Sequence, residues 1–205
     1  MVTTHNIRAV IWDLGGVILR TEDLSYREKW EKRLGLQPWG LASLIFGSEM
    51  SKLASVGQAQ ANDVWGAVQK ELALEEQDLA QLKGDFFAGD QIDEELMTFI
   101  RRIKDKYKSG MITNAWSDTR HWIIHEWKIG DAFDHILVSA EIGIVKPDAE
   151  IYSLSLEALD VQPDEAIFID DFVENVEGAE SVGMQTIHFQ EPDEVMKQLK
   201  ELLTI

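Results

Sequence analysis

The chain has 205 residues, with 37 acidic and 19 basic side chains, a formal net charge of −18 and no cysteine. A field of that sign repels phosphate backbones and anionic lipid surfaces, so we expect neither nucleic acid nor a membrane as a partner. The missing cysteines exclude disulfides, thiol catalysis and cysteine-bound metals. No stretch is typical of a signal peptide or a membrane span, and we therefore expect a cytoplasmic protein.

Short apolar runs recur along the chain and predict buried parallel strands. They fall at residues 9–12, 111–112, 136–138, 166–169 and 185–188. Helical patterns accompany the later strands, at about 93–107, 117–128, 149–159, 173–182 and 192–203. This alternation predicts an α/β fold in which a parallel sheet is covered by helices on both faces.

The first strand is followed by a long segment that breaks this rhythm. Residues 20–88 are helical in pattern throughout and carry only −3 of the net charge. We therefore divide the chain into a sheet domain, residues 1–19 and 89–205, and an inserted all-helical domain, residues 20–88.

Chemically active residues follow several of the predicted strands. Asp13 follows the first and Thr113 the second, Lys146 lies beyond the third, and Asp170 and Asp171 follow the fourth. Ligands of parallel α/β sheets bind outside the carboxyl ends of the strands, so these side chains are expected to converge.

The types of these residues suit phosphoryl transfer. Asp13, followed by two glycines, is placed to attack phosphorus, while Asp170 and Asp171 offer hard oxygen ligands for Mg²⁺. Thr113 is suited to hydrogen-bond a phosphoryl oxygen, and Lys146 to stabilise charge on the nucleophile and the transferred group.

Four short motifs in this order resemble the haloacid dehalogenase superfamily, in its phosphatase branch with a helical cap. They are residues 11–17 (IWDLGGV), 111–114 (MITN), 143–148 (GIVKPD) and 168–171 (FIDD), the last with Asn175. The stretches around them are similar to the phosphatase domain of soluble epoxide hydrolase and to bacterial sugar-phosphate phosphatases.

The resemblance implies a Rossmann-like core, dependence on Mg²⁺ and an aspartyl-phosphate intermediate. It assigns catalysis to Asp13, Thr113 and Lys146, and metal binding to Asp13, Gly15, Asp170 and Asp171. Leu14, Gly15 and Asn114 join Thr113 and Lys146 in binding the substrate. That substrate is expected to be a small phosphorylated metabolite, with sugar phosphates among the candidates.

One position departs from the family pattern. Most phosphatases of this family carry a second aspartate two residues after the nucleophile, where it protonates the leaving group, and here that residue is Gly15. Proton transfer contributes about 10²–10⁴-fold in rate. We therefore expect a slow enzyme, a substrate with a good leaving group, or an acid supplied from the cap.

Two other functions stay open from the sequence. A 2-haloacid dehalogenase shares the nucleophilic aspartate but uses no metal, and paired acids at 170 and 171 argue against it. A non-catalytic phosphate-binding protein of the same fold is the other. In the insert, Trp39, Phe46 and Trp65 either line the substrate pocket or form the cap's own core.

Overall fold

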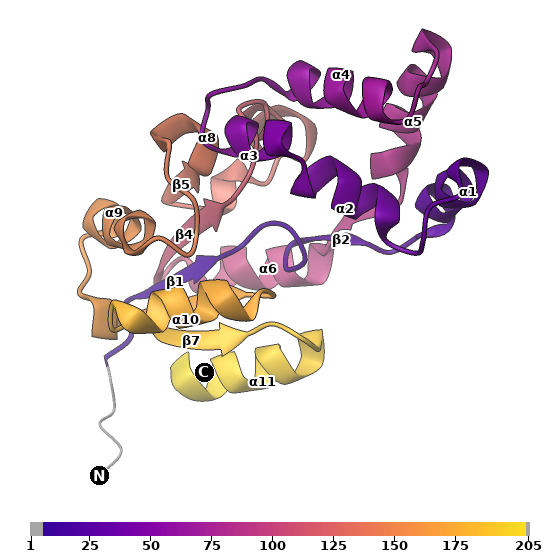
Figure 1. The fold of residues 1–205 in the computed structure, drawn as a ribbon. Coiled ribbons are helices and arrows are strands. Elements are labelled where there is room, and N and C mark those ends of the chain that lie inside the picture. Colours follow the sequence, from indigo (N-terminus) through magenta and orange to yellow (C-terminus); the bar gives the residue numbers. More distant parts are fainter. Residues whose placement is uncertain (1–5, 204–205) are drawn as a thin grey trace.

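The computed structural model describes residues 6–203, which form a parallel sheet with a helical cap at its carboxyl edge (Figure 1). The sheet has the strand order β5-β4-β1-β6-β7 and every neighbouring pair is parallel. Its strands are β1 (Ala9–Trp12), β4 (Lys108–Thr113), β5 (His135–Val138), β6 (Ala166–Asp170) and β7 (Gln185–His188). The predicted parallel α/β sheet is therefore confirmed, and the two strands that carry Asp13 and Asp170 lie side by side.

Helices cover both faces of the sheet because side chains alternate along each strand. Val10 and Trp12 of β1 point into a core with α6 and α11, and Ile11 points into a second core with α9 and α10. These helices are α6 (Glu94–Ile103), α9 (Ala149–Leu159), α10 (Val173–Ser181) and α11 (Pro192–Leu203). Continuous burial of β1 on both sides explains its unbroken apolar sequence.

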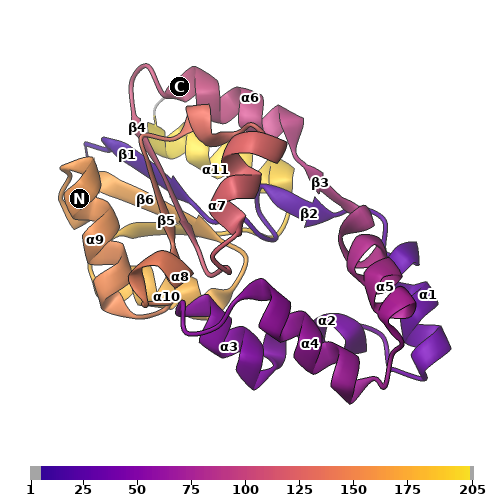
Figure 2. The same ribbon diagram turned by 90° about the horizontal axis from the view of Figure 1, so that it is seen from above.

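The cap consists of five helices that stand beyond the carboxyl edge of the sheet (Figure 2). They are α1 (Ser25–Leu34), α2 (Gly40–Gly47), α3 (Glu49–Ser55), α4 (Ala61–Glu71) and α5 (Glu76–Ala88). Their apolar faces form a third core. One residue of the sheet domain, Trp116, belongs to that core as well.

The connection between cap and sheet domain differs from the expected continuous helical insert. Strands β2 (Leu19–Thr21) and β3 (Asp90–Ile92) pair antiparallel and form a two-stranded ribbon at the base of the cap. Three-residue strands are too short to show a period-two pattern, so no sequence pattern predicts them.

The expected helix at 117–128 also differs in detail. It begins as α7 (Thr119–His121) and continues as a π-helical segment, Trp122–Glu126, in which Trp127 N–H donates to the carbonyl of Trp122. The remaining short elements are α8 (Ser139–Ile142) and 3₁₀ turns at Gly130–Ala132 and Pro163–Glu165. Among residues 6–203, no helix combines the length and the apolar character needed to cross a membrane.

Candidate active site

The nucleophile candidate Asp13 extends β1 by one residue at the centre of the sheet. Its backbone N–H donates to the carbonyl oxygen of Ile169 at 2.9 Å, which ties it to the end of β6. Because β6 ends at Asp170, this pairing brings the first and fourth motifs together. The carboxyl group of Asp13 lies in a buried site, with 6% of the residue exposed.

Lys146 bridges the two strands from the loop that precedes α9. Its Nζ lies 2.7 Å from Asp13 Oδ1 and 2.6 Å from Asp170 Oδ2, and its side chain is 1% exposed. Two carboxylates on one buried ammonium fix the position of that ammonium beside the nucleophile. The structure therefore joins three predicted site residues by direct contacts.

A pair of hydrogen bonds fixes the backbone of Lys146. Asn114 Nδ2 donates to the Lys146 carbonyl at 2.9 Å, and the Lys146 N–H donates to Asn114 Oδ1 at 2.8 Å. The sequence assigns Asn114 to substrate binding, but both polar ends of its amide contact Lys146. In this arrangement the amide orients the lysine loop.

Asp170 has both carboxylate oxygens engaged by protein groups. Oδ1 accepts from the Phe172 N–H at 2.8 Å and from Asn175 Nδ2 at 3.0 Å, and Oδ2 accepts from Lys146 Nζ and from Asn175. Asn175 is held in turn, because Tyr152 Oη donates to the backbone carbonyl oxygen of Asn175 at 2.7 Å. Asp170 is thus placed to orient Lys146, although it stays within reach of a shared cation.

Asp171 has a different environment from its neighbour. Its Oδ1 is buried and has no hydrogen-bond partner among the described residues. Ligand oxygens of Asp13, Asp170 and Asp171 all lie within 4.8 Å of one another. An orphaned carboxylate oxygen in such a cluster fits a bound cation, which would supply the missing partner.

Gly16 makes room for the Asp171 carboxylate. A Cβ at this position would lie 2.2 Å from Asp171 Oδ2, and the φ angle of +78° is also one that favours glycine. At Gly15, by contrast, a Cβ would meet no atom within 4 Å. The two adjacent glycines therefore differ in role. Gly16 lets the Asp171 carboxylate approach the backbone, whereas Gly15 borders open space.

Burial, together with the neighbouring carboxylates, makes Asp13 and Asp171 hard to ionise without a cation. Burial raises the pKa of Asp13 to about 7, with Asp170 adding to the shift and Lys146 opposing it. Burial and the neighbouring Asp170 raise the pKa of Asp171 to about 6. Burial disfavours the charged form of Lys146, but Asp13 and Asp170 outweigh it and raise its pKa, so the ammonium stays charged.

The remaining predicted residues lie on the same edge. Thr113 is the buried last residue of β4, the strand beside β1. The Leu14 side chain is buried in the first core, so any contact of Leu14 with a phosphate must use its backbone. Gly15 faces open space and pairs with Leu19 in an isolated bridge.

Sequence reasoning missed two residues that shape this edge. Ser139 Oγ accepts from the Ala115 N–H at 3.0 Å and so holds the loop after Thr113. Tyr152 acts through Asn175, whose backbone carbonyl accepts a hydrogen bond from its hydroxyl. Only Ser139 had a usable signal, because it directly follows the predicted third strand.

Residues 7–183 match the family of haloacid dehalogenase-like hydrolases, and the chain belongs to this family. It is 28% identical to the sesquiterpene phosphatase astK of Aspergillus oryzae, over 99% of both chains. It is 34% identical to glyceraldehyde 3-phosphate phosphatase of Pyrococcus furiosus, over 45% of this chain and 39% of that protein. It is 26% identical to bifunctional epoxide hydrolase 2 of Rattus norvegicus, where the match covers 60% of this chain and 23% of that protein.

Solved structures share the fold. A HAD-like family hydrolase from Porphyromonas gingivalis aligns with a TM-score of 0.78 at 19% identity, over 98% of this chain and 99% of that one. A HAD family enzyme from Bacteroides thetaiotaomicron, solved with magnesium and inorganic phosphate, aligns with a TM-score of 0.74 at 18% identity, over 91% and 96%. The predicted family and fold are therefore confirmed, and the protein is a haloacid dehalogenase-like hydrolase.

Proposed function

We propose that this protein is a Mg²⁺-dependent phosphomonoesterase of the cytoplasm that acts on a small phosphorylated metabolite through Asp13. The observation that carries the proposal is the cluster of Asp13, Lys146, Asp170 and Asp171, in which Asp171 Oδ1 has no hydrogen-bond partner within residues 6–203. Relatives named as phosphatases support the same activity.

In the first step a carboxylate oxygen of Asp13 attacks phosphorus and the bond from phosphorus to the leaving oxygen breaks. The product is an aspartyl phosphate and an alkoxide, which takes up a proton from water. Attack of water on the aspartyl phosphate then releases inorganic phosphate and restores the carboxylate. Each step needs the phosphoryl group in line with Asp13.

The residues around Asp13 have separate tasks in this scheme. Lys146 donates a hydrogen bond to Asp13 Oδ1. Its ammonium stabilises negative charge on that carboxylate and on the oxygens of the transferred phosphoryl group. Thr113 and the backbone N–H groups of Leu14 and Gly15 bind those oxygens. Asn114 and Asp170 keep Lys146 in place through the contacts described above.

Asp13, Asp171 and the Gly15 carbonyl would hold the magnesium ion, with Asp170 at its side. When bound, the ion supplies positive charge that offsets the repulsion between an anionic substrate and the site carboxylates. Two observations support this assignment. Asp171 Oδ1 has no hydrogen-bond partner among the described residues, and Gly16 leaves room for the Asp171 carboxylate beside it.

The test is hydrolysis of a panel of phosphomonoesters with and without Mg²⁺. We expect Mg²⁺-dependent turnover that Asp13→Asn abolishes, because an amide does not attack phosphorus, and that Asp105→Asn, an exposed aspartate outside the site, leaves unchanged. Acid quenching during turnover of ³²P-labelled substrate should leave label on the native protein and none on Asp13→Asn. Metal-independent halide release from a 2-haloacid would instead identify a dehalogenase, and absence of any turnover would favour a non-catalytic role.

A further inference from the structure

Strand β7 ends beside the fourth motif at the carboxyl edge of the sheet. Its register pairs His188 with Asp170. One residue further on, the backbone N–H of Phe189 donates to the carbonyl oxygen of Asp170 at 2.8 Å. The imidazole of His188 makes the next contact, because its Nε2 lies 2.9 Å from the carbonyl oxygen of Asp171. The end of β7 therefore holds two consecutive carbonyl groups of the fourth motif.

The contact of His188 completes the hydrogen bonding of the peptide group between Asp171 and Phe172. The N–H of this group belongs to Phe172 and donates to Asp170 Oδ1 at 2.8 Å. Its carbonyl oxygen belongs to Asp171 and can only accept, so Nε2 of His188 carries the hydrogen. Because a peptide group is planar, contacts at both polar ends fix its orientation, and with it the backbone that carries the Asp171 side chain.

The side chain of Asp171 depends on its backbone more than the side chain of Asp170 does. The Asp170 carboxylate is held directly by Lys146 and Asn175. Asp171 Oδ1, by contrast, has no hydrogen-bond partner in the described part of the chain. The other oxygen, Oδ2, lies where a side chain on Gly16 would stand. The placement of the Asp171 carboxylate therefore relies on the backbone that carries it.

We propose that His188 is a positioning residue that holds Asp171 in place for the magnesium ion. This inference rests on the proposed function, in which Asp171 is a ligand of that ion, and adds a residue to it. Removing a group that orients a metal ligand typically costs about 10–100-fold in metal affinity or activity. His188 makes a single hydrogen bond to the backbone of that ligand, so the expected loss is smaller, about three- to ten-fold.

His188 can be replaced without disturbing the core. Side chains alternate along β7, so Ile187 packs into the first core and His188 is exposed on the opposite side of the strand. Loss of the imidazole ring therefore removes little buried packing. A change in Mg²⁺ binding can then be separated from a change in Tm of the metal-free protein.

The experiment compares three replacements of His188 by calorimetric titration with Mg²⁺ at one fixed pH. His188→Leu removes the donor. His188→Gln supplies one in the same place, because its amide nitrogen lies as many bonds from Cβ as Nε2 of histidine does, whereas His188→Asn carries the same amide on a shorter side chain. The Leu and Asn variants should bind Mg²⁺ about three- to ten-fold more weakly than the native protein, and the Gln variant within about two-fold of it.

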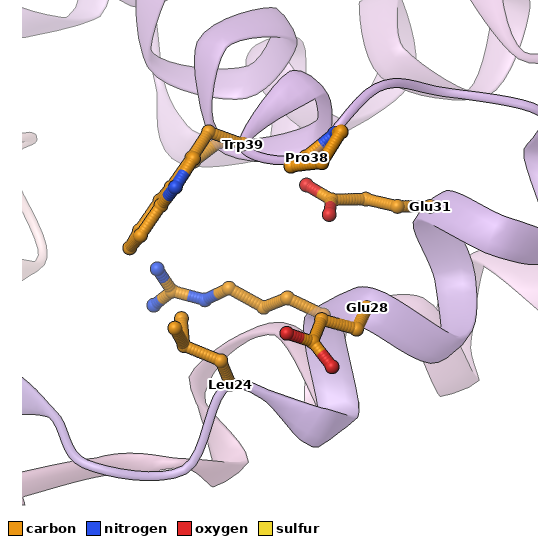
Figure 3. A pocket seen from close by; sticks show the side chains of 7 residues that line it. Leu24, Glu28, Glu31, Pro38 and Trp39 are labelled. Carbon is orange, nitrogen blue, oxygen red and sulfur yellow. The ribbon is translucent and has the colours of Figure 1, made fainter.

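Two controls separate this contact from other effects. Thr186→Val removes another side-chain hydrogen bond of β7, from Thr186 Oγ1 to Glu180 Oε1 at 2.7 Å, and should bind Mg²⁺ as the native protein does. A titration also reports weak Mg²⁺ binding by carboxylates outside the site. Figure 3 shows one carboxylate of that kind, Glu28, in the pocket between α1 and α2. Glu28→Gln should leave the effect of His188→Leu unchanged.

Turnover of 4-nitrophenyl phosphate separates metal affinity from the chemical step. His188→Leu should need an Mg²⁺ concentration about three- to ten-fold higher for its half-maximal rate. At saturating Mg²⁺ its kcat and its KM for the phosphate ester should match those of the native enzyme, because the ion then occupies the site in both proteins.

Unchanged Mg²⁺ affinity in His188→Leu would overturn the inference and leave the phosphomonoesterase intact. Equal weakening in the Leu and Gln variants would overturn it too, since the effect would then come from the ring and not from its hydrogen bond. An equally large loss in Thr186→Val would have the same meaning for β7 as a whole. A native protein that binds no Mg²⁺ and hydrolyses no phosphomonoester would refute the proposed function itself, and this inference with it.

Discussion

The replacement Gly15→Asp tests whether a missing proton donor limits this enzyme. A Cβ at Gly15 meets no atom within 4 Å, so the added carboxyl group has room two residues after the nucleophile. The charged groups that act on Asp13 are Lys146, Asp170 and Asp171. Lys146 already donates hydrogen bonds to two carboxylates. Asp170 is assigned to orienting that lysine, and Asp171 to holding the metal.

The expected gain depends on the leaving group. A positioned acid contributes about 10²–10⁴-fold where a proton must be transferred, which applies to an alkoxide of high pKa. A nitrophenolate leaves without a proton, so its release gains little. Gly15→Asp should therefore accelerate ethyl phosphate by about 10²-fold or more and 4-nitrophenyl phosphate by less than about ten-fold.

The assay is the slope of log kcat/KM against leaving-group pKa, for phenyl and short alkyl phosphates in Mg²⁺. The native enzyme should show a steep negative slope, and Gly15→Asp a shallow one. Gly15→Asn is the matched control, since it has the same size without an acid and should keep the steep slope. A flat slope in the native enzyme would mean that a cap residue or water already supplies the proton, and the role given to Gly15 would be wrong.

Three further outcomes follow from the geometry of the site. Asp171→Ala should weaken Mg²⁺ binding at least ten-fold in calorimetric titration, because it removes the carboxylate whose Oδ1 has no hydrogen-bond partner among the described residues. An unchanged titration would count against Asp171 as a metal ligand. Gly16→Ala should weaken Mg²⁺ binding as well, because its methyl group displaces Asp171, whereas Gly15→Ala should bind Mg²⁺ as the native protein does. Burial holds the pKa of Asp13 at about 7 and that of Asp171 at about 6, above the ordinary value of 3.8. Between about pH 4 and pH 7 the metal-free folded protein therefore retains protons that the unfolded chain releases. The free energy of unfolding of the metal-free protein should fall as the pH rises through this range. Since Mg²⁺ binds the ionised carboxylates, it should raise Tm more at pH 8 than at pH 5, and melting curves with Mg²⁺ or EDTA that show equal shifts at both would contradict this.

Much of the fold could be predicted because its signals are local. The strands at 9–12 and 166–169 are buried on both faces and so read as unbroken apolar runs, and helices such as 149–159 carry their own periodicity and caps. The ribbon of β2 and β3 carries no such signal. Its three-residue strands are defined only by pairing with each other across the whole cap.

For the site, the sequence determined which residues end the strands, and hence that Asp13, Thr113, Lys146 and the two aspartates share one edge. Parallel topology makes that convergence general, whatever the details of packing. The division of labour within the set was decided by tertiary structure alone. Asp170 and Asp171 are identical neighbours in the chain, yet the folded positions of Lys146 and Asn175 engage the Asp170 carboxylate. One oxygen of Asp171 is left without a hydrogen-bond partner in the described part of the chain.

The same holds for the cap. The sequence left Trp39, Phe46 and Trp65 as either pocket or core residues, because a helix with apolar residues on two faces does not say which face is covered. The structure buries Trp65 in the cap core and leaves Trp39, the residue before α2, exposed. Phe46 is half covered, because its ring contacts Phe86 of α5 and Trp116 of the sheet domain, which are far apart in the chain and meet only when cap and sheet pack together.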